Sequence, residues 1–171
     1  MSKEMTFSSE EIIVSKTDLK GNITYANRVF MRICNFPESA LLNKPHKLIR
    51  HEDMPKGVFY GMWKALQSGE EFFGFVKNST SDGNYYWVFA NVTPDYVGDK
   101  KVGYYSVRRV APQGSLTAVT ELYTQMKKIE DDCDKASAAK TSWEWLNSYC
   151  QETAGMSYDA FILNHYQTFR Q

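Results

Sequence analysis

The strongest topological signal in this chain is the stretch Asp18-Leu19-Lys20-Gly21-Asn22-Ile23-Thr24-Tyr25-Ala26-Asn27. Residues 12–17 are strand-like, residues 18–22 have turn composition, and residues 23–26 form a second short strand, so the stretch predicts a β-hairpin. Asn27 is suited to cap a helix through about Asn35, because an asparagine side chain accepts a hydrogen bond from a free amide of the first turn. The chain therefore opens with two strands and a helix.

The remaining pattern up to residue 110 completes an α+β domain. A short helix is expected over 37–42, a polar connector over 46–54 and a longer helix over 55–67, which begins at a proline. Three strands follow, and turn residues separate them. The strands are expected at 72–78, 84–94 and 101–110. Two strands, three helices and three strands predict a five-stranded antiparallel sheet with helices on one face.

A C-terminal segment over residues 111–171 differs in character. Apolar residues from Leu116 to Cys133 recur at three- and four-residue spacing, which predicts an amphipathic helix, and two further helices are expected around Trp143 and Phe161. We predict an N-terminal cap over 1–11, an α+β domain over 12–110 and a C-terminal helical appendage over 111–171. One face of the predicted strand 84–94, with Trp87 and Phe89, is too apolar to face water. The cap, the helical segment or a second subunit should cover it.

Composition excludes several classes of protein. The chain has 171 residues, and Lys plus Arg equals Asp plus Glu at 20 each, so we expect no nucleic-acid partner. No run approaches the roughly 18 apolar residues of a membrane helix, so direct membrane insertion is not expected. Residues 1–11 lack the apolar centre of a signal peptide, and three scattered cysteines suit a reducing compartment, so the sequence favours a cytoplasmic protein. No catalytic constellation stands out, and we do not expect an enzyme.

A candidate ligand site lies around the predicted start of the helix 55–67. His46, Arg50, His51 and Asp53 precede this helix start, where amides and the helix dipole favour negative charge. The helix then presents Phe59 and Trp63. An anion-binding group beside aromatic rings suits a nucleotide cofactor. A zinc site is a poor alternative, because no cysteine lies near the histidines.

Asn78 is the most informative polar residue on the predicted strands. If it points inward, its amide needs a partner, because an unpaired buried amide costs roughly 1–3 kcal/mol. The edge of a heterocyclic ligand or a backbone group would serve. Gly74 and Ala90 are small residues that are also expected to face inward, which leaves room for a ligand.

These elements and motifs resemble a PAS sensory domain and, within that superfamily, the PAS domain of bacterial aerotaxis receptors. The resemblance covers about residues 12–110 and rests chiefly on the run Arg50-His51-Glu52-Asp53-Met54-Pro55, with support from Met62-Trp63 and Tyr86-Trp87-Val88. It implies non-covalent binding of FAD. The positions it links to the ligand are Asn27, His46, Arg50, His51, Asp53, Phe59, Trp63 and Asn78.

The run Val76 to Gly83 also resembles the strand end of flavin-binding light-oxygen-voltage domains. This second resemblance supports Asn78 and implies that Val88 and Tyr105 face the pocket. Phe72 is also expected in the ring pocket, and it departs from the aerotaxis PAS domains, which often carry a tryptophan at this position. The reactive cysteine of the photosensors is absent from residues 46–53, so photoadduct chemistry is not expected.

The resemblance implies a redox- or oxygen-linked sensor that signals to a separate membrane-bound methyl-accepting transducer, through the transducer's cytoplasmic linker. A homodimer is compatible with this arrangement. Two alternatives stay open from the residues alone. One is a haem-binding PAS gas sensor with an axial histidine, and the other is a cofactor-free PAS module for dimerisation or docking.

Overall fold

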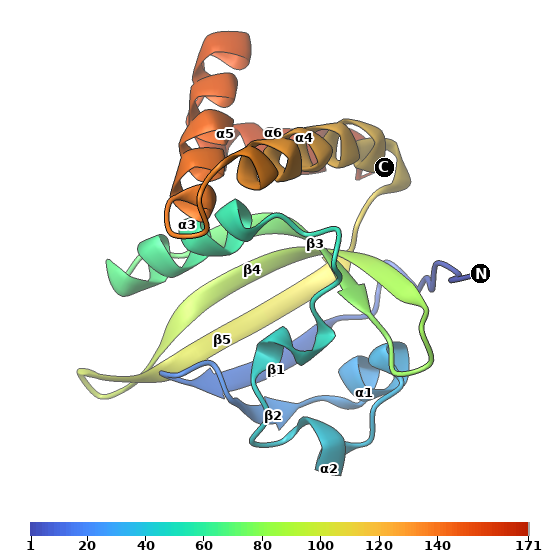
Figure 1. Ribbon diagram of the computed structural model, residues 1–171. Coiled ribbons are helices and arrows are strands. Elements are labelled where there is room, and N and C mark those ends of the chain that lie inside the picture. Colours follow the sequence, from blue (N-terminus) through green and yellow to red (C-terminus); the bar gives the residue numbers. More distant parts are fainter. Residues whose placement is uncertain (171) are drawn as a thin grey trace.

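The computed structural model describes residues 1–170 and has an α+β architecture built on one five-stranded antiparallel sheet (Figure 1). The strand order is β2-β1-β5-β4-β3, so β3 is an edge strand. The strands are β1 (Ile13–Asp18), β2 (Ile23–Ala26), β3 (Phe72–Ser79), β4 (Tyr85–Val97) and β5 (Lys100–Val110). The connection from β2 to β3 holds α1 (Arg28–Cys34), α2 (Glu38–Leu41), the 3-10 helix η1 (His46–Ile49) and α3 (Lys56–Gln67). The predicted fold is confirmed.

The opening hairpin forms for the reasons that its sequence suggests. Gly21 adopts a φ of +86°, which favours glycine, and the Asp18 carboxylate accepts hydrogen bonds from the amides of Lys20 and Asn22, each at 2.9 Å. Asn27 caps α1 by accepting a hydrogen bond from the Phe30 amide at 2.9 Å. The first helix is thereby fixed directly after β2.

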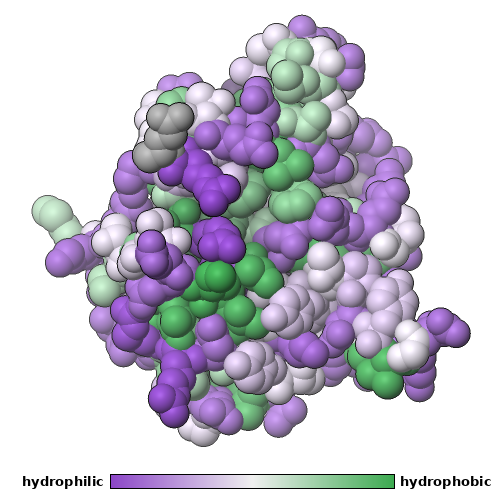
Figure 2. Space-filling model, turned by 180° about the vertical axis from the view of Figure 1, so that it is seen from behind, coloured by the Kyte–Doolittle hydropathy of each residue, from purple (hydrophilic) through white to green (hydrophobic). Residues whose placement is uncertain are grey.

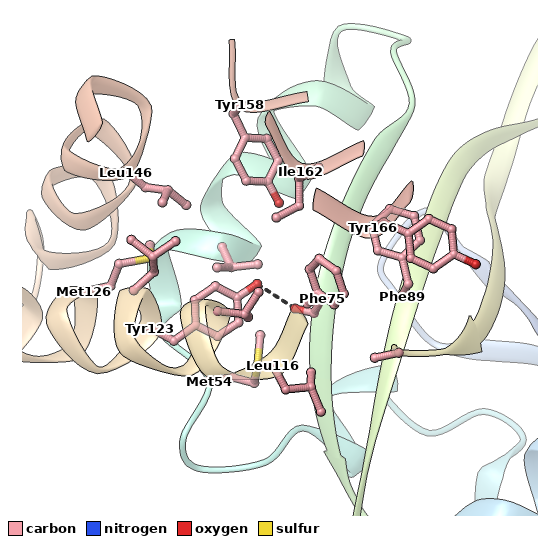
Figure 3. Close-up of a cluster of buried hydrophobic side chains, with 14 of the residues drawn as sticks. Met54, Phe75, Phe89, Leu116, Tyr123, Met126, Leu146, Tyr158, Ile162 and Tyr166 are labelled. Carbon is pink, nitrogen blue, oxygen red and sulfur yellow. Dashed lines mark hydrogen bonds between the residues drawn. The ribbon is translucent and has the colours of Figure 1, made fainter. Parts of the chain in front are cut away.

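Three C-terminal helices lie across the sheet from α1 and α2 (Figure 1). They are α4 (Gln113–Asp132), α5 (Ala138–Ala154) and α6 (Tyr158–Phe169). They share one hydrophobic cluster with β3 and β4, drawn in Figure 3, where Phe89 stacks on Tyr166 with ring centroids 4.0 Å apart. The helical segment therefore covers the apolar face that includes Trp87 and Phe89.

The C-terminal helices also pair with the free edge of β3. The Tyr123 hydroxyl donates a hydrogen bond to the Phe75 carbonyl at 2.6 Å, the contact dashed in Figure 3, and the Tyr158 hydroxyl donates to the Phe73 carbonyl at 2.8 Å. Phe73 and Phe75 belong to the edge strand, whose other side is hydrogen-bonded to β4. Tyrosines from α4 and α6 thus satisfy two carbonyls of the strand edge, and the His51 amide bonds a third, that of Lys77, at 3.2 Å.

Helix α3 is held between the sheet and the C-terminal helices. The Glu130 carboxylate of α4 accepts hydrogen bonds from the first amides of α3, those of Lys56 at 3.0 Å and Gly57 at 2.8 Å. A Cβ atom at Gly61 would lie 2.5 Å from the Trp143 ring of α5. The two helices therefore approach closely because this position has no side chain.

The surface is mostly hydrophilic when seen from behind, with hydrophobic residues gathered near the middle of that view (Figure 2). The large exposed hydrophobic residues do not include Trp87 or Phe89. Among residues 1–170, no helix combines the length and the apolar character that crossing a membrane requires.

Candidate functional site

A cavity of about 530 Å³ lies between α3, η1 and the inner face of the sheet. This volume is within the usual range for small-molecule and cofactor sites. Its walls come from β1, η1, α3, β3, β4 and β5. The lining residues are Thr17, Lys20, Gly21, Pro45, His46, Lys47, Arg50, Phe59, Met62, Trp63, Leu66, Val76, Asn78, Ala90, Val92, Tyr104, Ser106 and Arg108.

One wall is the apolar face of α3. Phe59, Met62, Trp63 and Leu66 follow at spacings of three, one and three residues, which places them on one side of a helix. Trp63 meets Tyr104 edge to face, with ring centroids 5.2 Å apart. This wall offers aromatic and aliphatic surface against which a planar ligand could pack.

The opposite wall is the sheet, and it contains an unpaired amide. Ala90 and Val92 are short side chains that keep the space open. Asn78, near the end of β3, is only 3% exposed, and its Nδ2 atom has no hydrogen-bond partner among residues 1–170. A buried donor without a partner costs roughly 1–3 kcal/mol, so this position is suited to a ligand acceptor.

The open side of the cavity is basic. Lys20, Lys47 and Arg50 are exposed residues that line it, and the Arg50 guanidinium stacks over the Phe59 ring at 3.4 Å from the centroid. Partial desolvation of its guanidinium lowers the pKa of Arg50, but an arginine stays charged at neutral pH. Positive charge here would favour an anionic part of a ligand.

A second cationic group lies at the buried side of the cavity. The Arg108 guanidinium donates a hydrogen bond to the Ser15 hydroxyl, lies 3.3 Å from the His46 Nε2 atom and packs over the Phe30 ring at 4.4 Å. Burial lowers the pKa of Arg108 to about 10, and burial together with the neighbouring guanidinium lowers the pKa of His46 to about 3. The histidine is therefore neutral and the arginine charged at pH 7.

A family model described as the PAS fold matches residues 23–124 of this chain. The chain belongs to the PAS fold family. It is 39% identical over 116 residues to the aerotaxis receptor of Escherichia coli (strain K12), a match over 68% of this chain and 23% of the receptor. It is 32% identical over 83 residues to the nitrogen fixation regulatory protein of Klebsiella pneumoniae, over 48% of this chain and 17% of that protein. The matches thus span less than a quarter of these relatives.

Solved structures agree with the PAS fold. A light-oxygen-voltage domain from work on a flavin analogue matches with a TM-score of 0.56 at 18% identity, over 64% of this chain and 83% of that chain. The light state of the blue-light photoreceptor Aureochrome1 LOV matches with a TM-score of 0.55 at 16% identity, over 71% of this chain and 94% of that chain. At these identities the likeness concerns the fold alone.

The PAS cavity brings together five of the residues that the sequence singled out. These are His46, Arg50, Phe59, Trp63 and Asn78. They come from η1, the residue that follows it, α3 and β3, which are distant in sequence and meet only through the fold. The other six predicted site residues do not line the cavity.

Three of these six residues organise the connections around the cavity. Asn27 uses its side chain to cap α1 and to bond the backbone of β1. Asp53 pairs with Lys77 at 2.6 Å, on the side of the sheet edge away from the cavity. His51 accepts a hydrogen bond from the Asp53 amide at 3.1 Å and meets Tyr85 edge to face.

The other three residues lie on strands β3, β4 and β5 but do not line the cavity. Phe72 stacks against Tyr158 of α6 with ring centroids 5.7 Å apart. Val88 is completely buried in the cluster beneath α1. Tyr105 lies on the outer face of β5 under the Lys16 ammonium, so our expectation that it faces the pocket needs correction. The observed register turns its neighbour Tyr104 inward instead, because successive strand residues point to opposite faces.

The sequence interpretation missed the basic groups Lys20, Lys47 and Arg108. Residues 104–109 offered no simple signal, because either alternating set on β5 carries a tyrosine and an arginine: Tyr104 with Arg108, or Tyr105 with Arg109. Only the pairing of Ala90 with Arg108 fixes which arginine is internal. Among the described residues, no cluster of three His, Cys, Asp or Glu side chains could hold a metal ion.

Proposed function

We propose that this PAS domain binds FAD non-covalently in the cavity and acts as a redox- or oxygen-linked sensor rather than an enzyme. The observation that carries the proposal is the buried, unpaired Asn78 amide on the wall of a cavity of about 530 Å³. The similarity of the chain to the aerotaxis receptor supports a sensory role. The chain also shares its fold with a light-oxygen-voltage domain from work on a flavin analogue.

The residues present suit a flavin. Asn78 would hydrogen-bond the polar edge of the ring, and Phe59, Trp63 and Val92 would pack on its apolar surface. When bound, the flavin supplies reversible electron transfer and a charge that changes with redox state. The protein's part is to bind the ring, shield it from water and respond to that charge.

The basic open side of the cavity favours a flavin dinucleotide over a flavin without phosphate groups. Lys20, Lys47 and Arg50 would attract a diphosphate, and Arg50 is positioned by its stacking on Phe59. The sequence places both Arg50 and His51 before the helix start where negative charge is favoured. His51 lies outside the cavity lining, so the two lysines take its place in the proposal.

The alternatives are less well supported. A haem would need an axial ligand, but the His46 Nε2 atom already lies 3.1 Å from the Ser15 hydroxyl and next to the cationic Arg108, which would repel a bound metal ion. A module without a ligand would be expected to fill its interior with side chains. The open cavity and the unpaired amide argue against that.

Helix α3 is the proposed route of the signal. One face of α3 lines the cavity. The glycines of α3 lie against α5, and Glu130 of α4 caps the first turn of α3. A change at the ligand that shifts α3 would reach the C-terminal helices. We propose that a separate membrane-bound methyl-accepting transducer reads this change, through its cytoplasmic linker.

An absorption spectrum of the purified chain, before and after incubation with FAD, tests the proposal. We expect a flavin band near ~450 nm that stays with the protein through gel filtration. Asn78→Ala should weaken FAD binding about 5- to 10-fold, which is the effect of one lost hydrogen bond of about 1 kcal/mol, and should change the reduction potential. Asn91→Ala, outside the cavity lining, is the matched control. Protein that stays colourless after reconstitution would contradict the proposal, and a Soret band would favour haem.

A further inference from the structure

Arg108 is a buried cation that the protein leaves without a negative partner. The residue is 2% exposed, and it forms no ion pair with any carboxylate in the described part of the chain. Its contacts are the Ser15 hydroxyl, the neutral His46 ring and the face of Phe30, and within residues 1–170 its Nε atom has no hydrogen-bond partner. The same side chain lines the ligand cavity.

Such an arrangement is costly unless an opposite charge lies near the guanidinium. A buried charge is normally paired, because removing it from water costs several kcal/mol unless an opposite charge and hydrogen bonds compensate. The aromatic face of Phe30 and a hydroxyl offset only part of that cost. A negative charge that arrives with a ligand would offset more of it, and would do so in a site of low dielectric where the attraction is strong.

We infer that Arg108 is the specificity-determining residue that shifts the preference of this cavity towards the more negative, reduced form of its flavin. The inference rests on the proposed function. Two electrons and one proton convert the neutral oxidised ring into a reduced ring that carries one negative charge. A fixed buried guanidinium favours that added charge, so it raises the reduction potential of the bound flavin relative to a site without it.

Ser15 provides a test that leaves Arg108 in place. Its hydroxyl already accepts a hydrogen bond from the guanidinium, so Ser15→Asp would introduce a carboxylate beside the cation. The charge would then be neutralised within the protein. Ser15→Asn has nearly the same shape without the charge and is the matched control. Arg108→Gln removes the charge from the other side of the pair, and Arg108→Lys keeps it.

The experiment measures, for the full chain reconstituted with FAD, the dissociation constant of the oxidised form and the reduction potential during a dithionite titration. Dithionite supplies the electrons, and solvent supplies the proton. Together these give the ratio of the dissociation constants for oxidised and reduced flavin. Ser15→Asp and Arg108→Gln should each lower this ratio about tenfold, which corresponds to a potential about 30 mV lower for a two-electron couple. Ser15→Asn and Arg108→Lys should change it less than threefold.

A melting curve of the flavin-free protein gives a second readout. Ser15→Asp should melt at or above the wild-type temperature, because the new carboxylate pairs with a buried cation. If Ser15→Asp or Arg108→Gln still binds oxidised FAD and keeps the wild-type ratio of the two dissociation constants, the role of Arg108 is overturned. The proposed function would not be affected by that result. Wild-type protein that takes up no FAD would instead overturn the proposed function. If one of the variants Ser15→Asp and Arg108→Gln does not fold, the other is enough for the test.

Discussion

At the scale of single residues, Trp63 supplies the largest aromatic surface in the cavity. Trp63→Ala should weaken FAD binding about 10- to 100-fold, because burying a large apolar side chain contributes roughly 1.5–3 kcal/mol. Fluorescence quenching of added FAD measures the affinity. Trp145→Ala is the control, since Trp145 packs against Tyr149 in α5 and not in the cavity. Equal losses in both variants would show that Trp63 acts through general stability only.

His46 makes stability depend on pH. Its folded-state pKa of about 3 lies below the ordinary value of 6.5, so below pH 6.5 the unfolded chain binds a proton that the folded chain does not. The contribution of His46 to stability is complete above pH 6.5 and is lost as the pH falls towards 3, by about 1 kcal/mol per pH unit.

Urea unfolding at several pH values measures this effect. His46→Gln should lose less stability than the wild type between pH 6.5 and 5, because glutamine does not titrate there. Parallel pH profiles for the two proteins would contradict the buried neutral histidine. His165→Gln is the control, because His165 lies in α6 and bonds a backbone carbonyl of α4.

The residue scale is also where sequence interpretation reached its limit. Five site residues were predicted because short motifs carried them, and the structure brings those five to one cavity. Tyr105 was misplaced because a strand register that is wrong by one residue reverses every side chain. Arg108 could not be singled out before the partner strand fixed the register.

At the scale of elements, the glycines of α3 set the distance to α5. Alanine normally stabilises a helix relative to glycine by about 1 kcal/mol. At Gly61 we expect the opposite sign, because the added Cβ would lie 2.5 Å from the Trp143 ring, and overpacking costs roughly 1–3 kcal/mol. Urea unfolding of Gly61→Ala measures this, with Lys64→Ala on the exposed side of α3 as control. A more stable Gly61→Ala protein would show that the Trp143 ring moves aside to accommodate the added Cβ atom.

The elements themselves were largely predictable, because hydrophobic periodicity and turn residues mark them. Two departures have local causes. β4 continues past Pro94 to Val97, since the pairing with β5 shifts register at Asp95 and Tyr96 and then resumes. The expected connector 46–54 contains the short helix η1, which its charge-rich sequence did not predict.

At the scale of the whole molecule, the C-terminal helices are bound to the PAS sheet by buried tyrosine hydroxyls. Tyr123→Phe and Tyr158→Phe should each cost roughly 1–3 kcal/mol of unfolding free energy, because each leaves a carbonyl of β3 without its partner. Tyr149→Phe in α5, away from the sheet, is the control. Thermal and urea unfolding measure the effect. Losses no greater than in the control would mean that water replaces these hydroxyls.

From the sequence, the C-terminal helical segment was one of three candidates to cover the apolar strand face, with the N-terminal cap and a second subunit. An apolar face shows that something covers it but not which element does. The structure fills that face with α4 and α6. Deleting residues 114–171 would therefore expose Trp87 and Phe89, and we expect the shortened chain to self-associate in gel filtration. A soluble monomer with normal FAD uptake would show that the α+β part is self-sufficient.

The close contact between Gly61 and Trp143 has a consequence for ligand exchange. Because the wall formed by α3 rests directly on α5, it has little slack with which to move outward. On the basic side of the cavity, η1 meets the β1–β2 turn through the hydrogen bond from the His46 amide to the Gly21 carbonyl at 2.9 Å, and Lys20 and Lys47 are exposed there. A cofactor bound as proposed would therefore enter and leave on this basic side, past the exposed lysines, and not by displacing α3.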